Sequence, residues 1–192
     1  GISICIGNLN VGGSGKSPLT LYLMKAFQST HTIQVLSRGY GRKTKGHIQL
    51  TPAHHAADVG DEPLMYFKQK TPQDEIHVSE NRIKAIGNLN RDSNHILLLD
   101  DAFQHRKLQR NLDIVILDAT ESKVSYEYLP YGRAREQFGA LSRAHCVFIT
   151  NSNIADKECL EWLKAQLPEI PTYEFEIHLV GYENLKTKER KD

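Results

Sequence analysis

A glycine-rich segment directly after a short apolar run is the feature that most constrains this chain. Residues 3–6 have the composition of a buried strand, and residues 11–18 read VGGSGKSP. Glycines allow backbone amides to converge on an anion, and a helix that begins at the lysine directs its positive N-terminal end at the same anion. The segment predicts a loop that binds the phosphates of a nucleoside triphosphate between a strand and a helix.

Each residue of this loop has a predicted role. Lys16 would neutralise the β- and γ-phosphates, which makes it a catalytic as well as a binding residue, and Ser17 would offer its hydroxyl to Mg²⁺. Asn10 stands where a strict G-x-x-x-x-G-K-[ST] motif has its first glycine. Pro18 stands where the dinucleotide fingerprint needs a third glycine, which disfavours that alternative. The remaining predicted nucleotide contacts are Gly12, Gly13, Ser14 and Gly15.

The rest of the chain alternates short apolar runs with helical patterns. Near-continuous apolar runs indicate strands that are covered on both faces of a sheet. Their alternation with helices predicts an α/β fold of the P-loop NTPase type, with a mainly parallel sheet flanked by helices. At about 150 residues per domain, we expect a single domain over 1–192, with a frayed charged tail over 186–192. The predicted strands are 3–6, 33–36, 76–78, 96–99, 114–117 and 147–150, and the predicted helices are 16–27, 62–70, 81–90 and 156–167.

Three carboxylates are candidates for the chemistry. Asp100 and Asp101 end the apolar run that starts at Ile96, where a buried strand tip favours two acids only if a cation compensates them. Both are candidate Mg²⁺ ligands, although successive side chains point in opposite directions and should differ in role. The alternative for Asp101 is a helix N-cap. Asp61, in the sequence GDEP, is either catalytic or an ordinary helix start.

A basic, glycine-rich loop follows the second predicted strand. Arg38 and Arg42 lie in residues 37–43 (SRGYGRK), where two guanidinium groups would suit a phosphorylated substrate. An ordinary solvated loop is the alternative. Arg133, Arg135 and Arg143 offer a second anion contact.

Composition excludes several other classes of protein. Lys plus Arg number 24 and Asp plus Glu 23, so the net charge of +1 argues against a nucleic-acid partner. No apolar run approaches the roughly 20 residues of a membrane-spanning helix. The three cysteines, Cys5, Cys146 and Cys159, show no metal-binding spacing and fit reduced thiols.

Five segments together resemble the tetraacyldisaccharide 4′-kinase family, the lipid A 4′-kinases. The resemblance extends in order over residues 1 to about 151, and the family also lacks the glycine that Asn10 replaces. Each motif is short, but five in the same order are specific. The segments are 7–18 (GNLNVGGSGKSP), 36–42 (LSRGYGR), 59–63 (VGDEP), 99–105 (LDDAFQH) and 129–136 (LPYGRARE).

The resemblance implies an ATP- and Mg²⁺-dependent kinase. It would phosphorylate the 4′-hydroxyl of tetraacyldisaccharide 1-phosphate during lipid A synthesis, at the cytoplasmic face of the bacterial inner membrane. It also implies that Asp61 is the catalytic aspartate and that Asp100 and Asp101 are the family's acidic pair. The family's N-terminal membrane helix and its C-terminal lobe, with an Asp-His pair, are not evident in this sequence.

Two alternatives remain open from the residues. The first is a nucleotide-binding fragment without sugar kinase activity. The second is a GTPase-type switch, for which the nearest guanine-reading segment, 151–154 (NSNI), lacks the Lys and Asp of Asn-Lys-x-Asp.

Overall fold

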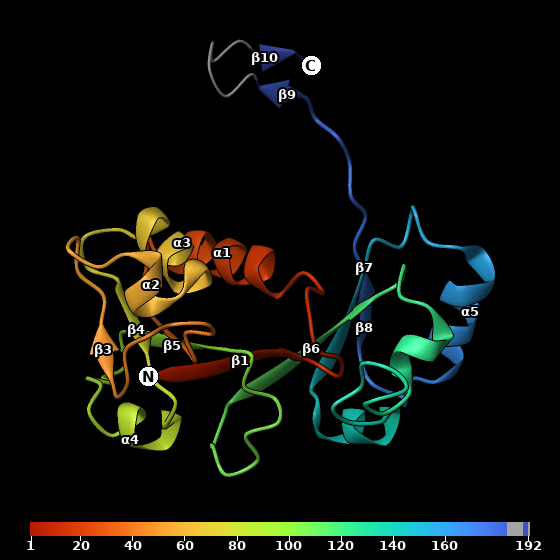
Figure 1. Ribbon diagram of the computed structural model, residues 1–192, viewed down its shortest axis with the longest axis horizontal. Helices are drawn as coiled ribbons and strands as arrows, with labels where there is room; N and C mark the ends of the chain where they lie inside the picture. Colours follow the sequence, from red (N-terminus) through yellow and green to blue (C-terminus); the bar gives the residue numbers. More distant parts are fainter. Residues whose placement is uncertain (184–189, 192) are drawn as a thin grey trace.

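The computed structural model describes residues 1–183 and 190–191. Its main feature is a sheet with helices on both faces (Figure 1). Within the described residues the sheet has the strand order β3-β4-β2-β5-β1-β6-β7-β8, in which β3 is antiparallel to β4 and every other neighbouring pair is parallel. This arrangement confirms the predicted α/β class.

Every predicted strand is present, with bounds that extend by zero to two residues at each end. The strands of the sheet are β1 (Ile2–Asn8), β2 (Thr32–Ser37), β3 (Ile48–Gln49), β4 (Glu75–Val78), β5 (His95–Asp100), β6 (Leu112–Asp118), β7 (Cys146–Thr150) and β8 (Thr172–Glu174). Because β1 pairs with β5 and β6, the P-loop strand stands between the acidic strand and the strand that ends at Asp118.

The helices are α1 (Lys16–Phe27), α2 (Ala56–Val59), α3 (Asp61–Gln69), α4 (Arg82–Ile86) and α5 (Lys157–Ala165). Asn81 and Asp156 cap α4 and α5 by accepting backbone N–H bonds at 3.0 Å from Lys84 and Cys159. The prediction of a helix over 81–90 was too long, because α4 ends at Ile86 with Gly87 as its C-cap and a polar stretch follows.

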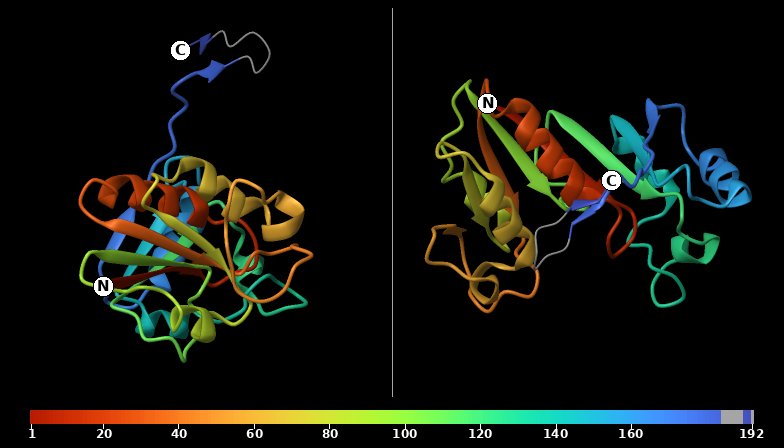
Figure 2. Two further views of the ribbon diagram at one scale, coloured as in Figure 1. Left: turned by 90° about the vertical axis from the view of Figure 1, so that its left-hand side faces the viewer. Right: turned by 90° about the horizontal axis from the view of Figure 1, so that it is seen from above.

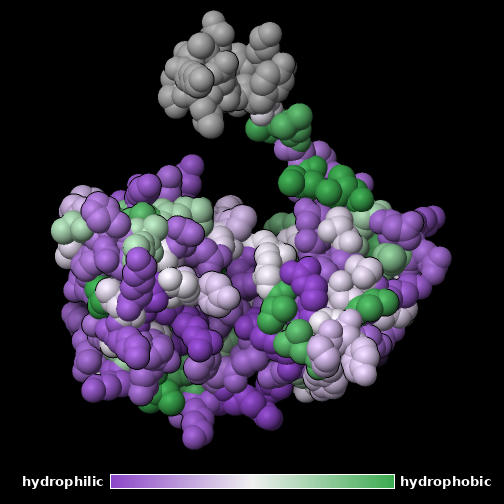
Figure 3. All heavy atoms as spheres, viewed as in Figure 1, coloured by the Kyte–Doolittle hydropathy of each residue, from purple (hydrophilic) through white to green (hydrophobic). Residues whose placement is uncertain are grey.

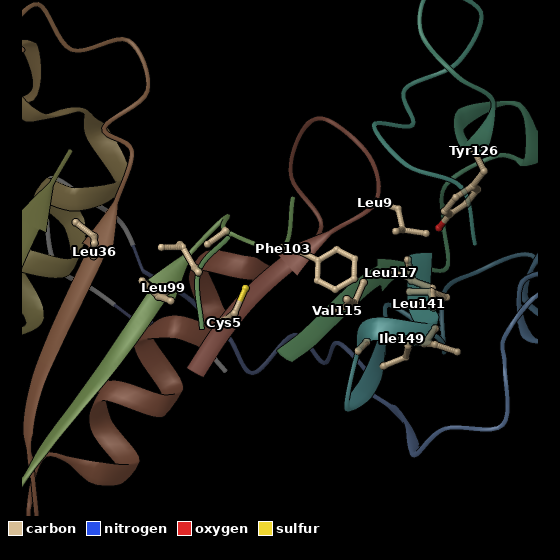
Figure 4. Packing of buried hydrophobic residues seen from close by; sticks show 14 of the residues in the cluster. Cys5, Leu9, Leu36, Leu99, Phe103, Val115, Leu117, Tyr126, Leu141 and Ile149 are labelled. Atoms are coloured by element: carbon tan, nitrogen blue, oxygen red, sulfur yellow. The ribbon is translucent and has the colours of Figure 1, made fainter. Parts of the chain in front are cut away.

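The sheet separates two hydrophobic clusters, because successive side chains of a strand point to opposite faces. Ile4 and Ile6 of β1 belong with Met24 of α1 to the cluster on one face, and Cys5 belongs with Leu163 of α5 to the cluster on the other. Figure 4 shows part of the second cluster, which includes Phe103, Leu117 and Ile149. The fold therefore has three layers, with the sheet between two sets of helices.

The elements that the sequence did not predict are short. Among them are β3, α2, β8 and two 3₁₀ turns, η1 (Lys123–Tyr126) and η2 (Phe138–Arg143), which lie between β6 and β7. The predicted frayed tail lies outside the described residues except for β10 (Arg190–Lys191), which pairs antiparallel with β9 (Tyr182–Glu183).

The connection from β8 to β9 leaves the main body of the fold (Figure 2). Hydrophobic side chains lie along it (Figure 3), and Ile177, Leu179 and Val180 are 55, 86 and 73% exposed. None of the helices in the described part of the chain combines the length and apolar composition that crossing a bilayer requires.

Candidate active site

The predicted phosphate loop joins β1 to α1 and is shaped by two glycines. Gly12 and Gly15 have φ angles of 108° and 93°, in the region that favours glycine. A Cβ on Gly12 would lie 1.9 Å from Nη2 of Arg133. The loop curls around its own lysine, since Nζ of Lys16 donates a hydrogen bond of 3.0 Å to the carbonyl of Gly12. Burial lowers the pKa of Lys16, against the opposing charges of Asp101 and Asp100.

Asp100 lies next to this loop, at the tip of β5. Its partner in β1 is Ile6, two residues before that strand ends. Its side chain is buried, and neither carboxylate oxygen has a hydrogen-bond partner. Burial, reinforced by the negative charge of Glu62, raises the pKa of Asp100 to about 6. An unpartnered carboxylate at this depth is a group that a cation would stabilise.

Asp101 has different surroundings from its neighbour. Its φ of 48° turns it out of the strand, and Arg135 holds it with two bonds, Nη1 to Oδ2 at 2.9 Å and Nη2 to Oδ1 at 2.6 Å. Nζ of Lys16 lies 4.0 Å from Oδ1. Although burial acts in the opposite direction, the hydrogen bonds and charge of Arg135 lower the pKa of Asp101. Arg135 therefore stabilises the charged form of Asp101, whereas burial disfavours the charged form of Asp100.

Arg135 also connects a distant segment to the loop. It donates a side-chain hydrogen bond to Oδ1 of Asn8, and its backbone N–H donates to the carbonyl of Leu9 at 2.8 Å. Two residues earlier, the carbonyl of Arg133 accepts a bond of 2.8 Å from Val11. The segment that follows η1 thus forms one wall of the phosphate loop.

These groups surround one cavity of about 530 Å³. It brings together the predicted residues Gly12, Gly13, Lys16, Arg38, Asp100 and Asp101. The other lining residues are Val11, Ser37, Tyr40, Glu62 and Arg135. Loop, basic group and acidic tip therefore share one rim of the sheet.

The structure does not bring every predicted residue to this cavity. Arg42 is turned away, because its largely buried guanidinium pairs with Glu80 and donates to the carbonyl of Gly46 at 2.7 Å. That geometry does not support the predicted substrate contact. Asp61 is exposed at the start of α3 and does not line the cavity, so its catalytic role stays a prediction.

Three predicted loop contacts also lie outside the cavity lining. Ser14 is buried with an unpartnered hydroxyl, and Gly15 lies at the N-cap of α1. Ser17 is linked to the cavity by Glu62, a lining residue. The hydroxyl of Ser17 donates a hydrogen bond of 2.6 Å to Oε1 of Glu62.

Two residues at the site, Glu62 and Arg82, were not among those predicted from the sequence. Glu62 follows Asp61 in the first turn of α3, so the GDEP segment was the available signal. Arg82 is buried and donates to the carbonyl of Asp100 at 2.8 Å, which holds the backbone of the strand tip in place. No local pattern marks that contact, since the two residues are 18 positions apart.

The donor set fits Mg²⁺ only in the company of a nucleotide. In the ranges 1–183 and 190–191, no three His, Cys, Asp or Glu side chains come together to hold a metal by themselves. Mg²⁺ in kinase sites takes most of its ligands from phosphates and water and needs only one or two protein oxygens. The unpartnered carboxylate of Asp100 and the hydroxyl of Ser17 can supply those oxygens.

A glycine-rich loop between β1 and α1, opposite an acidic strand tip, defines the class of P-loop nucleotide-binding proteins. The family model of the Tetraacyldisaccharide-1-P 4′-kinases matches residues 3–192, and the chain belongs to this family. Among solved structures, the chain is similar to LpxK from Aquifex aeolicus, an "apo" form in complex with ATP, with a TM-score of 0.74 and 32% identity. That match covers 90% of this chain and 53% of the other.

Relatives give the same family. The Tetraacyldisaccharide 4′-kinase of Bdellovibrio bacteriovorus is 37% identical over 193 residues, which cover 96% of this chain and 56% of that protein. The enzyme of the same name from Bacteroides thetaiotaomicron is 41% identical over 150 residues, covering 77% of this chain and 39% of that protein. The chain therefore spans about half the length of the curated relatives it matches.

Proposed function

We propose that this chain binds ATP with Mg²⁺ and transfers the γ-phosphoryl group to the 4′-hydroxyl of a tetraacyldisaccharide 1-phosphate, a step of lipid A synthesis. One observation carries the proposal: Lys16 and the glycines of the loop face Asp100 and Asp101 across a single cavity. The family supplies the acceptor, because its name specifies a tetraacylated disaccharide 1-phosphate. We place the reaction at the cytoplasmic face of the inner membrane, where such a lipid would be presented.

In this proposal the chain's own groups position and stabilise the transferred charge. The amides of Gly12 to Gly15 and the ammonium of Lys16 hold the β- and γ-phosphates, which favours a loose transition state rich in negative charge. Arg38, exposed at the cavity, approaches either the acceptor's phosphate or the group in transfer. Asp101 holds Lys16 and Arg135 in place rather than reacting itself.

Asp100 and Ser17 are the residues that would hold Mg²⁺. When bound, the metal would neutralise charge on the β- and γ-phosphates. Its arrival would also give the buried carboxylate of Asp100 the partner that it lacks.

The central test is turnover of ATP with the disaccharide acceptor in detergent micelles. We expect Lys16→Ala to lower kcat by about 10³-fold, because a charge aimed at the transferred group is lost. Lys25→Ala is the matched control, since Lys25 is an exposed lysine at the other end of α1. Near-normal turnover by Lys16→Ala would contradict the proposal.

We propose Asp61 as the group that accepts or positions the proton of the 4′-hydroxyl. Asp61→Asn should then lower kcat by about 10²–10⁴-fold while the affinity for ATP, measured by calorimetry, stays unchanged. The control is Asp58→Asn, a carboxylate of the preceding helix that caps α2. A kcat close to that of the control would remove Asp61 from the chemistry.

The same assays separate the two alternatives. A chain that binds ATP but does not phosphorylate the acceptor is a nucleotide-binding portion of a longer enzyme. A GTPase switch would prefer GTP, and the family match and the sequence of residues 151–154 do not favour it.

A further inference from the structure

We propose that two loops at the mouth of the cavity form a lipid-contact surface that seats this mouth on an anionic bilayer. We call this surface the mouth rim and define it as residues 38–45 and 124–133. The inference rests on the proposed function, because an acceptor with four acyl chains brings its hydroxyl to the cavity only if the mouth faces the lipid.

Both loops of the mouth rim expose large apolar side chains. Tyr40 is 90% exposed and also lines the cavity. On the other side, Val124, Leu129 and Tyr131 are 62, 56 and 88% exposed. Tyrosine and leucine on loop tips suit the boundary between headgroups and acyl chains, since the ring is apolar and the hydroxyl stays wet.

The exposure is built into an ordered loop. Backbone bonds of 2.9–3.0 Å tie residues 132, 133 and 134 to the carbonyls of Tyr128, Ser125 and Glu127. A Cβ on Gly132 would lie 2.3 Å from two carbonyl oxygens of the same loop, so the backbone is closely packed. This well-ordered segment presents Leu129 and Tyr131 to solvent, and we assign a lipid phase as the partner of these side chains.

The two loops border the same opening. Arg133 accepts a backbone bond from Val11 at the tip of the phosphate loop, and its guanidinium lies against Gly12. Tyr40 lines the same cavity as Val11 and Gly12. In the view from above, both loops extend past the sheet on the same side (Figure 2). A flat surface that touches both would therefore cover the cavity mouth.

The charges of the mouth rim favour an anionic surface. Arg38, Lys43 and Lys45 are exposed, whereas the acidic Glu80 nearby is engaged by Arg42 and the amide of Gly46. On the other loop, Arg133 and Glu121 pair at 2.8 Å and cancel, and Glu127 is exposed, so the positive charge of the mouth rim lies on residues 38–45. Basic residues interleaved with exposed aromatic side chains match the headgroup region of an anionic bilayer, which is the partner we propose for the mouth rim.

The test is co-sedimentation of the chain with vesicles of phosphatidylcholine, with and without phosphatidylglycerol. Lys43→Gln/Lys45→Gln should weaken binding to the anionic vesicles by about 25-fold, about fivefold per lysine, and leave binding to neutral vesicles unchanged. Leu129→Ser/Tyr131→Ser should weaken binding to both kinds by about tenfold. Tyr22→Ser/Ile154→Ser, which removes exposed apolar residues outside the mouth rim, should bind like the wild type.

The proposed lipid contact of the mouth rim is refuted if the mouth-rim variants sediment like the wild type. It is also refuted if the wild type does not sediment with anionic vesicles. Urea midpoints equal to the wild type confirm that the variants fold, as expected for exposed side chains. Failure of the proposed function would look different: phosphorylation of the acceptor in detergent would be absent from the wild type while vesicle binding still depended on the mouth rim.

Discussion

Replacing Asp100 by asparagine should stabilise the metal-free protein at neutral pH while abolishing its activity. The carboxylate is 1% exposed, has no hydrogen-bond partner and has its pKa raised from 3.8 to about 6. At about 1.36 kcal/mol per pH unit, keeping this group ionised in the folded state costs about 3 kcal/mol. Asparagine has the same shape without the charge, so Asp100→Asn should raise the free energy of unfolding by up to about 3 kcal/mol.

The pH dependence of this gain has a definite sign. Because the pKa of Asp100 is higher in the folded state than in the unfolded state, its favourable contribution is complete below pH 3.8 and is lost as the pH rises through about 6. The difference in the free energy of unfolding between variant and wild type should therefore be close to zero below about pH 4. It should grow between about pH 4 and 6 and stay constant above about pH 7.

Urea unfolding in EDTA, followed by circular dichroism across this pH range, measures the difference. Asp101→Asn is the matched control and should show the opposite sign. The pKa of Asp101 is lowered by its bonds to Arg135, which outweigh burial, so its contribution is present at neutral pH and lost in acid. A variant Asp100→Asn that is less stable than the wild type at pH 7.5, or whose gain does not change with pH, would refute the reasoning.

Two other perturbations test the loop and its wall. Gly12→Ala should lower the free energy of unfolding by about 1–2 kcal/mol and weaken ATP binding, because φ at this position is 108°. Gly13→Ala is the control, since Gly13 has no positive φ and an added Cβ there has no atom within 4 Å. It should be close to neutral in the same urea and calorimetry experiments. Arg135→Lys should cost about 1–2 kcal/mol in urea unfolding, since lysine cannot make the two parallel bonds to the carboxylate, and Arg106→Lys at an exposed site should cost nothing measurable. Equal stability of the two members of either pair would contradict the role given to the first.

The sheet was predictable because its strands are buried on both faces. Runs such as 96–99 and 114–117 have no polar residue, and that pattern follows directly from covering by helices on each side. The phosphate loop was predictable for a related reason: glycine, lysine and serine are required at fixed spacing by the anion itself. In both cases the cause lies within a few residues of sequence.

The walls of the site were not predictable, because tertiary contacts create them. Arg135 reaches Asp101 from 34 positions away, and Arg82 reaches the same strand tip across 18. For Arg42 the local pattern predicts a contact that the fold does not provide. Its glycine-rich context is typical of a phosphate contact, but Glu80, 38 positions later, engages its guanidinium. Local patterns identify residues that can bind an anion, whereas the fold decides which of them face the cavity.

The site as it stands holds two charges that burial disfavours. Burial lowers the pKa of Lys16 and raises that of Asp100, so each group is pushed toward its neutral form at the same rim. A triphosphate would supply negative charge beside the ammonium, and its magnesium ion would supply positive charge beside the carboxylate. Because each component relieves a different buried charge, we expect nucleotide and metal to bind this chain more tightly together than separately.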